Sequence, residues 1–179
     1  MTSPAALYAA IDGTWPAASR TPTGPWTIRD GQGGGKRVSA ATAQGTVADA
    51  DIPQAETAMR ALGQTPLVMI RDSDSALDAD LAARGYTVVD PTNGYTIATS
   101  KLTDTPIPRV TAFAIWEPLA IMDEIWAKGG IGPARLNVMA RTDTKTGILA
   151  RRNGKPAGTA FVAITDRIPL AHAAEVLDH

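Results

Sequence analysis

Residues 145–179, KTGILARRNGKPAGTAFVAITDRIPLAHAAEVLDH, decide the fold that we expect for this chain. Two short breaks divide the stretch, Asn153-Gly154 and Asp166-Arg167. Asn-Gly tolerates the positive φ angles that a two-residue type I′ hairpin turn requires. The stretch therefore predicts three consecutive antiparallel strands, over residues 145–151, 156–165 and 168–177.

Side chains alternate along a strand, so the third predicted strand would have two faces. One face would carry Ile168, Leu170, His172, Ala174 and Val176, and the other Ala171, Ala173, Glu175 and Leu177. Both sets are largely apolar, which is typical of a strand inside a sheet that is covered on both sides. The end of such a strand is a common place for ligands in α/β folds.

The composition is that of an ordinary globular protein, with 179 residues, 44% hydrophobic and 20% charged. A net charge of -1 gives no sign of a nucleic-acid partner or of an anionic membrane surface. The absence of cysteine excludes disulfides, thiolate zinc sites and a cysteine nucleophile. With only two histidines, a metal site would have to rely on carboxylates, and we expect none. No signal-peptide pattern and no membrane-length apolar run are present, so we expect a cytoplasmic protein.

Helix and strand patterns alternate in the first half of the sequence. Ser3-Pro4 begins one predicted helix, and Asp51 begins another that ends at Gly63. The run 67–70 is continuously apolar, as in a buried strand. A helix over 75–84 and strands over 86–89 and 95–98, joined by a turn, are expected to follow. The predicted class is α/β.

A glycine-rich loop, Asp30-Gly31-Gln32-Gly33-Gly34-Gly35-Lys36, lies between predicted strands over 26–29 and 37–42. It lacks the first glycine and the final Ser or Thr of a Walker loop, and Lys36 replaces the third glycine of a dinucleotide fingerprint. We also expect no helix to begin directly after it. The loop is therefore interpreted as a flexible hairpin tip rather than a phosphate site.

Residues 102–109, with Pro106 and Pro108, mark the one predicted boundary, which divides the chain into residues 1–101 and 102–179. The second part begins with a strand over 110–115. A helix over 118–128 follows, and Gly129-Gly130 ends it. A short helix beginning at Pro133 then leads into the three strands.

This second part resembles the N-terminal portion of the GNAT superfamily of N-acetyltransferases. The resemblance is carried by the segments 113–116, 118–128, 153–154, 157–162 and 173–177, that is FAIW, the first helix, the Asn-Gly turn, AGTAFV and AAEVL. It implies a mixed, mostly antiparallel sheet flanked by helices. It also implies a transferase, an acyltransferase that moves the acetyl group of acetyl-CoA directly to a primary amine, without a metal and without a covalent enzyme intermediate.

The resemblance also implies the residues of the site. The thioester carbonyl would meet the backbone amide of Val176 or Leu177, and the segment Glu175–Leu177 would bind acetyl-CoA. Gly129, Gly130 and Ile131 would border the acceptor amine, and Glu175 would be the catalytic base, with its pKa raised by burial. Two alternatives stay open: Glu175 meets solvent or an arginine, and the glycines only end a helix. His172 is expected to be a hydrogen-bonded core residue.

In the family, a pyrophosphate-binding loop follows the last of these strands, and the sequence ends at that point. Residues 67–98 are similar to the C-terminal portion of a GNAT domain, so the chain would hold two GNAT-like halves. The alternative function is a degenerate or truncated module that acts in protein interaction or small-ligand binding without turnover. Its exposed last strand would then pair with a second copy in a homodimer.

Overall fold

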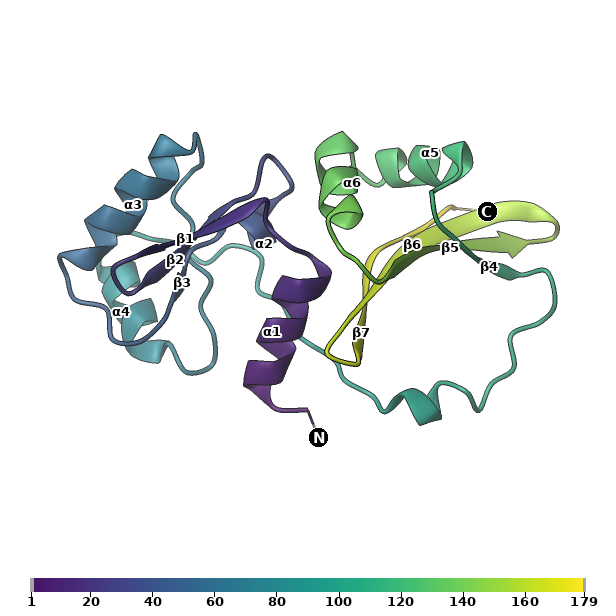
Figure 1. Ribbon diagram of the computed structural model, residues 1–179, viewed down its shortest axis with the longest axis horizontal. Helices are drawn as coiled ribbons and strands as arrows, with labels where there is room; N and C mark the ends of the chain where they lie inside the picture. The colour runs from purple at the N-terminus through teal and green to yellow at the C-terminus, as the bar shows by residue number, and fades with distance from the viewer. Residues whose placement is uncertain (1, 179) are drawn as a thin grey trace. The chain divides into compact units, whose positions relative to one another are not determined.

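The computed structural model describes residues 2–178 and confirms the α/β class (Figure 1). The chain forms two compact units, which we describe separately. One unit comprises residues 17–95, and the other comprises residues 2–16 together with 96–178. Residues 2–16 therefore pack in the unit of the three predicted strands, although the sequence had placed them in the part that ends at residue 101.

A three-stranded antiparallel sheet organises residues 17–95. It has the order β1 (Ser19–Thr23), β2 (Trp26–Asp30), β3 (Thr42–Ala43). Its helices are α2 (Lys36–Ser39), α3 (Asp51–Ala61) and α4 (Ser75–Ala83). Apolar side chains of the sheet, α3 and α4 form its core, among them Trp26, Ile28, Met59, Leu77 and Leu81.

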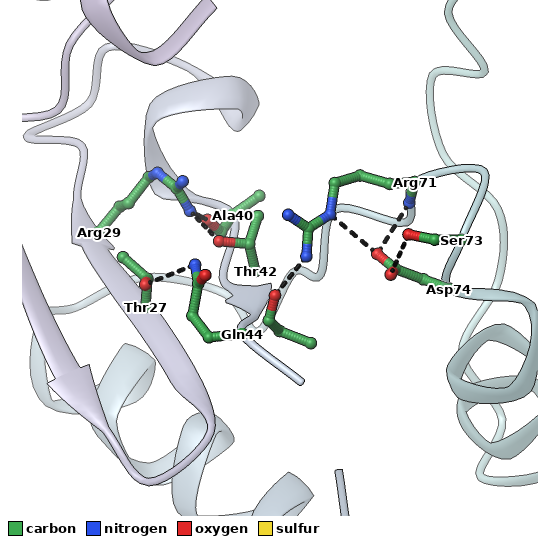
Figure 2. Close-up of polar contacts among 9 residues, drawn as sticks. Thr27, Arg29, Ala40, Thr42, Gln44, Arg71, Ser73 and Asp74 are labelled. Atoms are coloured by element: carbon green, nitrogen blue, oxygen red, sulfur yellow. Dashed lines mark hydrogen bonds and ion pairs between the residues drawn. The ribbon is translucent and has the colours of Figure 1, made fainter. Parts of the chain in front are cut away.

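Two arginines bind backbone carbonyls at the β3 side of this sheet (Figure 2). Arg29 Nη1 donates to the Ala40 carbonyl and to Thr42 Oγ1, each at 2.9 Å. Arg71 donates to the Ala43 carbonyl, and its Nε donates to Asp74 Oδ2 at 3.0 Å. These bonds hold the β3 segment between two guanidinium groups, so we assign both arginines a structural role.

The glycine loop differs from the prediction, because it joins β2 to a helix rather than to a strand. Helix α2 begins at Lys36, directly after Gly35, and continues to Ser39. Gly35 has a φ of 104° and Gly33 a φ of 75°, so the loop uses the freedom of glycine to reverse the chain. Lys36 Nζ lies 2.6 Å from Asp90 Oδ2 in an exposed ion pair.

The strands predicted over 67–70, 86–89 and 95–98 do not form. Only a single parallel bridge joins Val68 to Ala41. The later segment forms no helix or strand and is largely exposed, with Val88 79% and Tyr95 91% accessible. A strand exists only through hydrogen bonds to a neighbour, and among residues 2–178 these segments acquire none that makes a ladder. The strand β1, with Pro22 on a sheet edge, was not predicted.

The three strands predicted at the end of the sequence are confirmed. They are β5 (Lys145–Arg152), β6 (Lys155–Thr165) and β7 (Ile168–Val176), and β4 (Ala112–Ile115) completes an antiparallel sheet of order β4-β5-β6-β7. Asn153 and Gly154 have φ angles of 51° and 76°, as a type I′ turn requires. The second turn, at Asp166-Arg167, likewise has two positive φ angles, 46° and 65°.

Helices cover one face of this sheet. Gly147 of β5 lies under Met122 and Trp126 of α5 (Ala120–Lys128), and Phe161 is the cross-strand partner of Gly147. The Phe161 ring in turn contacts Trp15, which follows α1 (Pro4–Thr14). Partners across a ladder share a face, so α1 and α5 lie on the same side of the sheet. Helix α6 (Pro133–Ala140) and a short 3₁₀ helix, η1 (Thr99–Lys101), complete the unit.

The prediction that β7 is covered on both sides is wrong. β7 is an edge strand, and its exposure alternates along the chain. On the side away from α1 and α5, Ile164 of β6 is 43% exposed and Val176 is 82% exposed. The prediction failed because apolar side chains on a strand face do not ensure that a helix or a second sheet packs on that face.

His172 is the hydrogen-bonded core residue that the sequence predicted. It is 7% exposed, and its ring stacks near Trp15 with centroids 5.1 Å apart. Its Nε2 lies 2.9 Å from Thr14 Oγ1, while that hydroxyl donates to the Ala10 carbonyl at 2.7 Å. The hydroxyl proton is thereby used, so His172 Nε2 is the donor to Thr14. The bond attaches α1 to β7.

Tyr86 should titrate late. Its hydroxyl donates to Glu56 Oε1 at 2.8 Å; burial, followed by the interaction with Glu56, raises the pKa of Tyr86 to about 12. The same hydrogen bond lowers the pKa of Glu56. The folded pKa of Tyr86 lies above the unfolded value of about 10. Its contribution to stability is therefore complete below about pH 10 and is lost as the pH rises through the folded pKa.

Phenolate absorbance during a pH titration tests this expectation. One tyrosine should ionise near the folded pKa of Tyr86, and this transition should be missing in Tyr86→Phe. In Glu56→Gln it should move to lower pH, because the neutral amide no longer disfavours the phenolate. A Tyr86→Phe protein with an unaltered titration curve would contradict the assignment.

Candidate functional site

An extra residue in β7 determines how the end of this strand is presented. Phe161 pairs with His172 and Thr159 pairs with Glu175, so Ala173 and Ala174 of β7 lie opposite the single residue Ala160 of β6. Such a β-bulge reverses the alternation of the strand beyond it. His172 and Glu175 consequently lie on the same, helix-covered face. The sequence analysis had placed them on opposite faces, and that assignment is wrong.

The bulge is centred on Ala173. This residue has a φ of 49°, in the left-handed region where a side chain with Cβ costs about 1–2 kcal/mol. The indole Nε1 of Trp126 donates a hydrogen bond to the Ala173 carbonyl at 2.8 Å. Trp126 has no exposed surface, so the bond connects the core of α5 to the bulged backbone.

The inward turn of Glu175 brings it against the end of α5. A Cβ atom added to Gly129 would lie 2.2 Å from the Glu175 carboxyl carbon and 2.3 Å from its Oε2. The carboxylate therefore packs directly on the Gly129 backbone, where any side chain would collide with it. Two of the residues that the resemblance assigned to the site, Glu175 and Gly129, are thus brought together by the fold.

Val176 and Leu177 present their amides in opposite directions. The Leu177 amide donates to the Ala157 carbonyl of β6 at 2.8 Å. Amides alternate in direction along an antiparallel strand, so the Val176 amide points away from β6, toward the outer edge of β7. Of the two amides that the sequence analysis left open as oxyanion donors, only that of Val176 faces this edge.

The other two glycine-break residues are not equivalent to Gly129. Gly130 has a φ of 78°, and a Cβ there would meet nothing within 4 Å. Ile131 is 4% exposed, and its amide donates to the Trp126 carbonyl at 2.8 Å. Its side chain is buried in the core. The segment does end α5, whose C-cap is Gly129, so helix termination and contact with Glu175 occur at the same residue.

Two polar atoms close to these elements are buried without a hydrogen-bond partner. They are Thr159 Oγ1, on the residue paired with Glu175, and Asp123 Oδ1, one turn before Trp126 on α5. Thr159 is 4% exposed.

The sequence analysis missed Trp126, Ala173 and Thr159. Trp126 is a buried apolar residue of a predicted helix, and its indole N–H gave no signal of its own. Ala173 sits at a positive φ that usually attracts glycine, asparagine or aspartate, so its sequence carried no indication of a bulge. His179 lies outside the described residues.

Within residues 2–178, no group of three or more His, Asp or Glu side chains could hold a metal ion. No helix in the same range has the length and apolar character needed to cross a membrane. Comparisons with protein-family models, with curated proteins and with solved structures return no match to this chain.

Gly129→Ala should displace Glu175 with little effect on stability. Gly129 has a φ of -79°, so the backbone accepts alanine, and the colliding atoms are the far end of a flexible side chain. We expect the free energy of unfolding in urea to change by less than about 1 kcal/mol. The carbon NMR resonance of the Glu175 carboxyl should shift.

Gly132→Ala is the matched control, because a Cβ there meets nothing within 4 Å and its φ is -94°. It should leave the Glu175 resonance unchanged. Equal resonances in the wild type and in Gly129→Ala would show that the carboxylate does not lie on this backbone.

Proposed function

We propose that this protein is a GNAT-type N-acetyltransferase that moves the acetyl group of acetyl-CoA to a primary amine. The proposal rests on one observation: the end of β7 carries a carboxylate and an outward-pointing amide on neighbouring residues. The Glu175 carboxylate lies against Gly129, and the neighbouring Val176 amide points from the outer edge of β7. A base and an oxyanion donor are the two groups that direct acyl transfer to an amine requires.

In the proposed reaction, the neutral amine attacks the carbonyl carbon of the thioester, and a C–N bond forms. The carbonyl oxygen gains negative charge, and the Val176 amide donates a hydrogen bond to it. Glu175 accepts the proton that the nitrogen loses. The C–S bond then breaks, the thiolate of coenzyme A leaves, and a proton restores its thiol.

The outer edge of β7 supports acetyl-CoA as the donor. The pantetheine arm contains two amide groups, which can pair with an exposed strand edge as an added strand does. β7 is such an edge, and its side chains at the outer end are small or exposed, with Val176 82% accessible. Because acetyl-CoA is used inside the cell, the proposal also assigns the protein to the cytoplasm.

Glu175→Gln tests the base directly. General-base catalysis contributes about 10²–10⁴-fold, so we expect acetyl transfer to a panel of primary amines to fall by roughly 100-fold in kcat. The affinity for acetyl-CoA, measured by calorimetry, should stay within a few fold because the amide replaces the carboxylate without a change in volume.

Asp178→Asn is the control, since it removes an exposed carboxylate three residues further along the chain. It should retain wild-type kcat. Equal kcat values for Glu175→Gln and the wild type would remove Glu175 from the role of base, and a wild type without acetyl transfer to any amine would contradict the proposed activity.

A second function is favoured by the open edge of β7. β7 is the last strand in the order β4-β5-β6-β7, and Val176 near its end is 82% exposed. Such an edge could receive a strand of a second copy. A protein that sediments as a dimer and does not bind acetyl-CoA would favour this non-enzymatic module.

A further inference from the structure

We propose that Trp126 is a positioning residue, whose indole hydrogen bond to Ala173 selects the bulged register of β7. The catalytic consequence rests on the proposed function, whereas the choice of register does not. The Trp126 indole donates its hydrogen bond to the Ala173 carbonyl, not to Glu175 or Val176. It would act on the Glu175 carboxylate and on the Val176 amide through the backbone of Ala173.

Two registers compete for the end of β7. In the observed one, Glu175 pairs with Thr159 and Val176 with Gly158. Without the extra residue, strict pairing from His172 and Phe161 would put Ala174 opposite Thr159 and Glu175 opposite Gly158. A shift by one residue sends every following side chain to the other face. Glu175 would then leave Gly129 for the open face of the sheet.

The same shift would also consume the outward amide. The Ala157 carbonyl now accepts from Leu177. In the straight register Val176 would stand opposite Ala157 and donate to that carbonyl instead. The two groups of the proposed site would therefore be lost together. The bulged register exposes the Val176 amide and turns the Glu175 carboxylate inward, whereas the straight register does neither.

The backbone alone does not favour the bulge. Ala173 adopts a φ of 49°, which alanine disfavours, and the extra residue gives up ladder hydrogen bonds. The hydrogen bond from the Trp126 N–H compensates for these two costs. The indole N–H can only donate, and it belongs to a fully buried side chain, so it needs an acceptor inside the protein. If the bulge moved, the 2.8 Å bond to the Ala173 carbonyl would break and a buried donor would lose its partner.

The position of the indole is fixed independently of β7. A Cβ atom added to Gly147 of β5 would lie 3.7 Å from Trp126 Cη2, so the ring packs against β5 at this glycine. The Trp126 backbone carbonyl is also held, as the acceptor of the Ile131 amide at 2.8 Å. Contacts outside β7 therefore hold the ring in place, and the edge strand β7 binds to it.

NMR of four proteins tests the proposal: the wild type, Trp126→Phe, Ala173→Gly and the double variant. The cross-strand contact between the α-protons of Gly158 and Val176 reports the bulged register, and a contact between those of Gly158 and Glu175 reports the straight one. Trp126→Phe should raise the ratio of straight to bulged protein by roughly five- to tenfold, as expected for the loss of one hydrogen bond.

Glycine at 173 removes the penalty at positive φ. Ala173→Gly alone should keep the bulged register, and the double variant should regain it. A purely structural role of the indole predicts no such rescue, because Ala173→Gly does not refill the space that the larger ring occupied. Failure of the double variant to regain the Gly158–Val176 contact would overturn the proposal.

Ala173→Val keeps the test valid if Trp126→Phe does not fold. A β-branched residue is strongly disfavoured at positive φ, and the core around Trp126 stays intact. The variant should show the Gly158–Glu175 contact. Retention of the bulged register in Ala173→Val would overturn the proposal.

Assays of acetyl transfer distinguish the choice of register from the proposed function. If the proposed function holds, kcat/KM should fall in Trp126→Phe with the bulged fraction and recover in the double variant. If the wild type transfers no acetyl group but the registers shift as described, the register proposal stands and the proposed function fails. Constant registers in an active series would overturn the register proposal alone.

Discussion

The arrangement of the candidate site depends on one constraint, the extra residue that β7 holds against β6 at Ala173. Beyond it, Glu175 turns toward α5 and the Val176 amide turns outward. Gly129 lies where the carboxylate arrives, and its lack of a side chain makes room for it. The end of α5, the bulge and the strand edge are therefore a single structural unit.

The helices on one side of the sheet supply what the bulge requires. Trp126 of α5 reaches the Ala173 carbonyl, and Thr14 of α1 reaches His172 immediately before it. The strand is therefore held at the bulge itself and at the residue before it. The opposite face and the outer edge of β7 keep their exposure, and an incoming donor molecule or a second chain would meet these surfaces first.

Local signals explain which parts of the fold could be predicted. The Asn153-Gly154 turn specifies its hairpin through two positive φ angles, and Ser3 caps α1 as expected, accepting a hydrogen bond from the Ala6 amide. The strands over 67–70 and 86–98 failed because a strand needs a neighbour that its own sequence does not describe. Alternation correctly assigned β7 up to His172 and then failed, since no residue type at 173 indicated a bulge.

Amide hydrogen exchange at Val176, measured with and without acetyl-CoA, tests the central claim most directly. In the free protein the Val176 amide should exchange fast, while the neighbouring Leu177 amide, bonded to Ala157, exchanges slowly. Acetyl-CoA should slow exchange at Val176 and leave Leu177 unchanged. A Val176 amide that is already protected in the free protein, or that acetyl-CoA does not protect, would contradict the account.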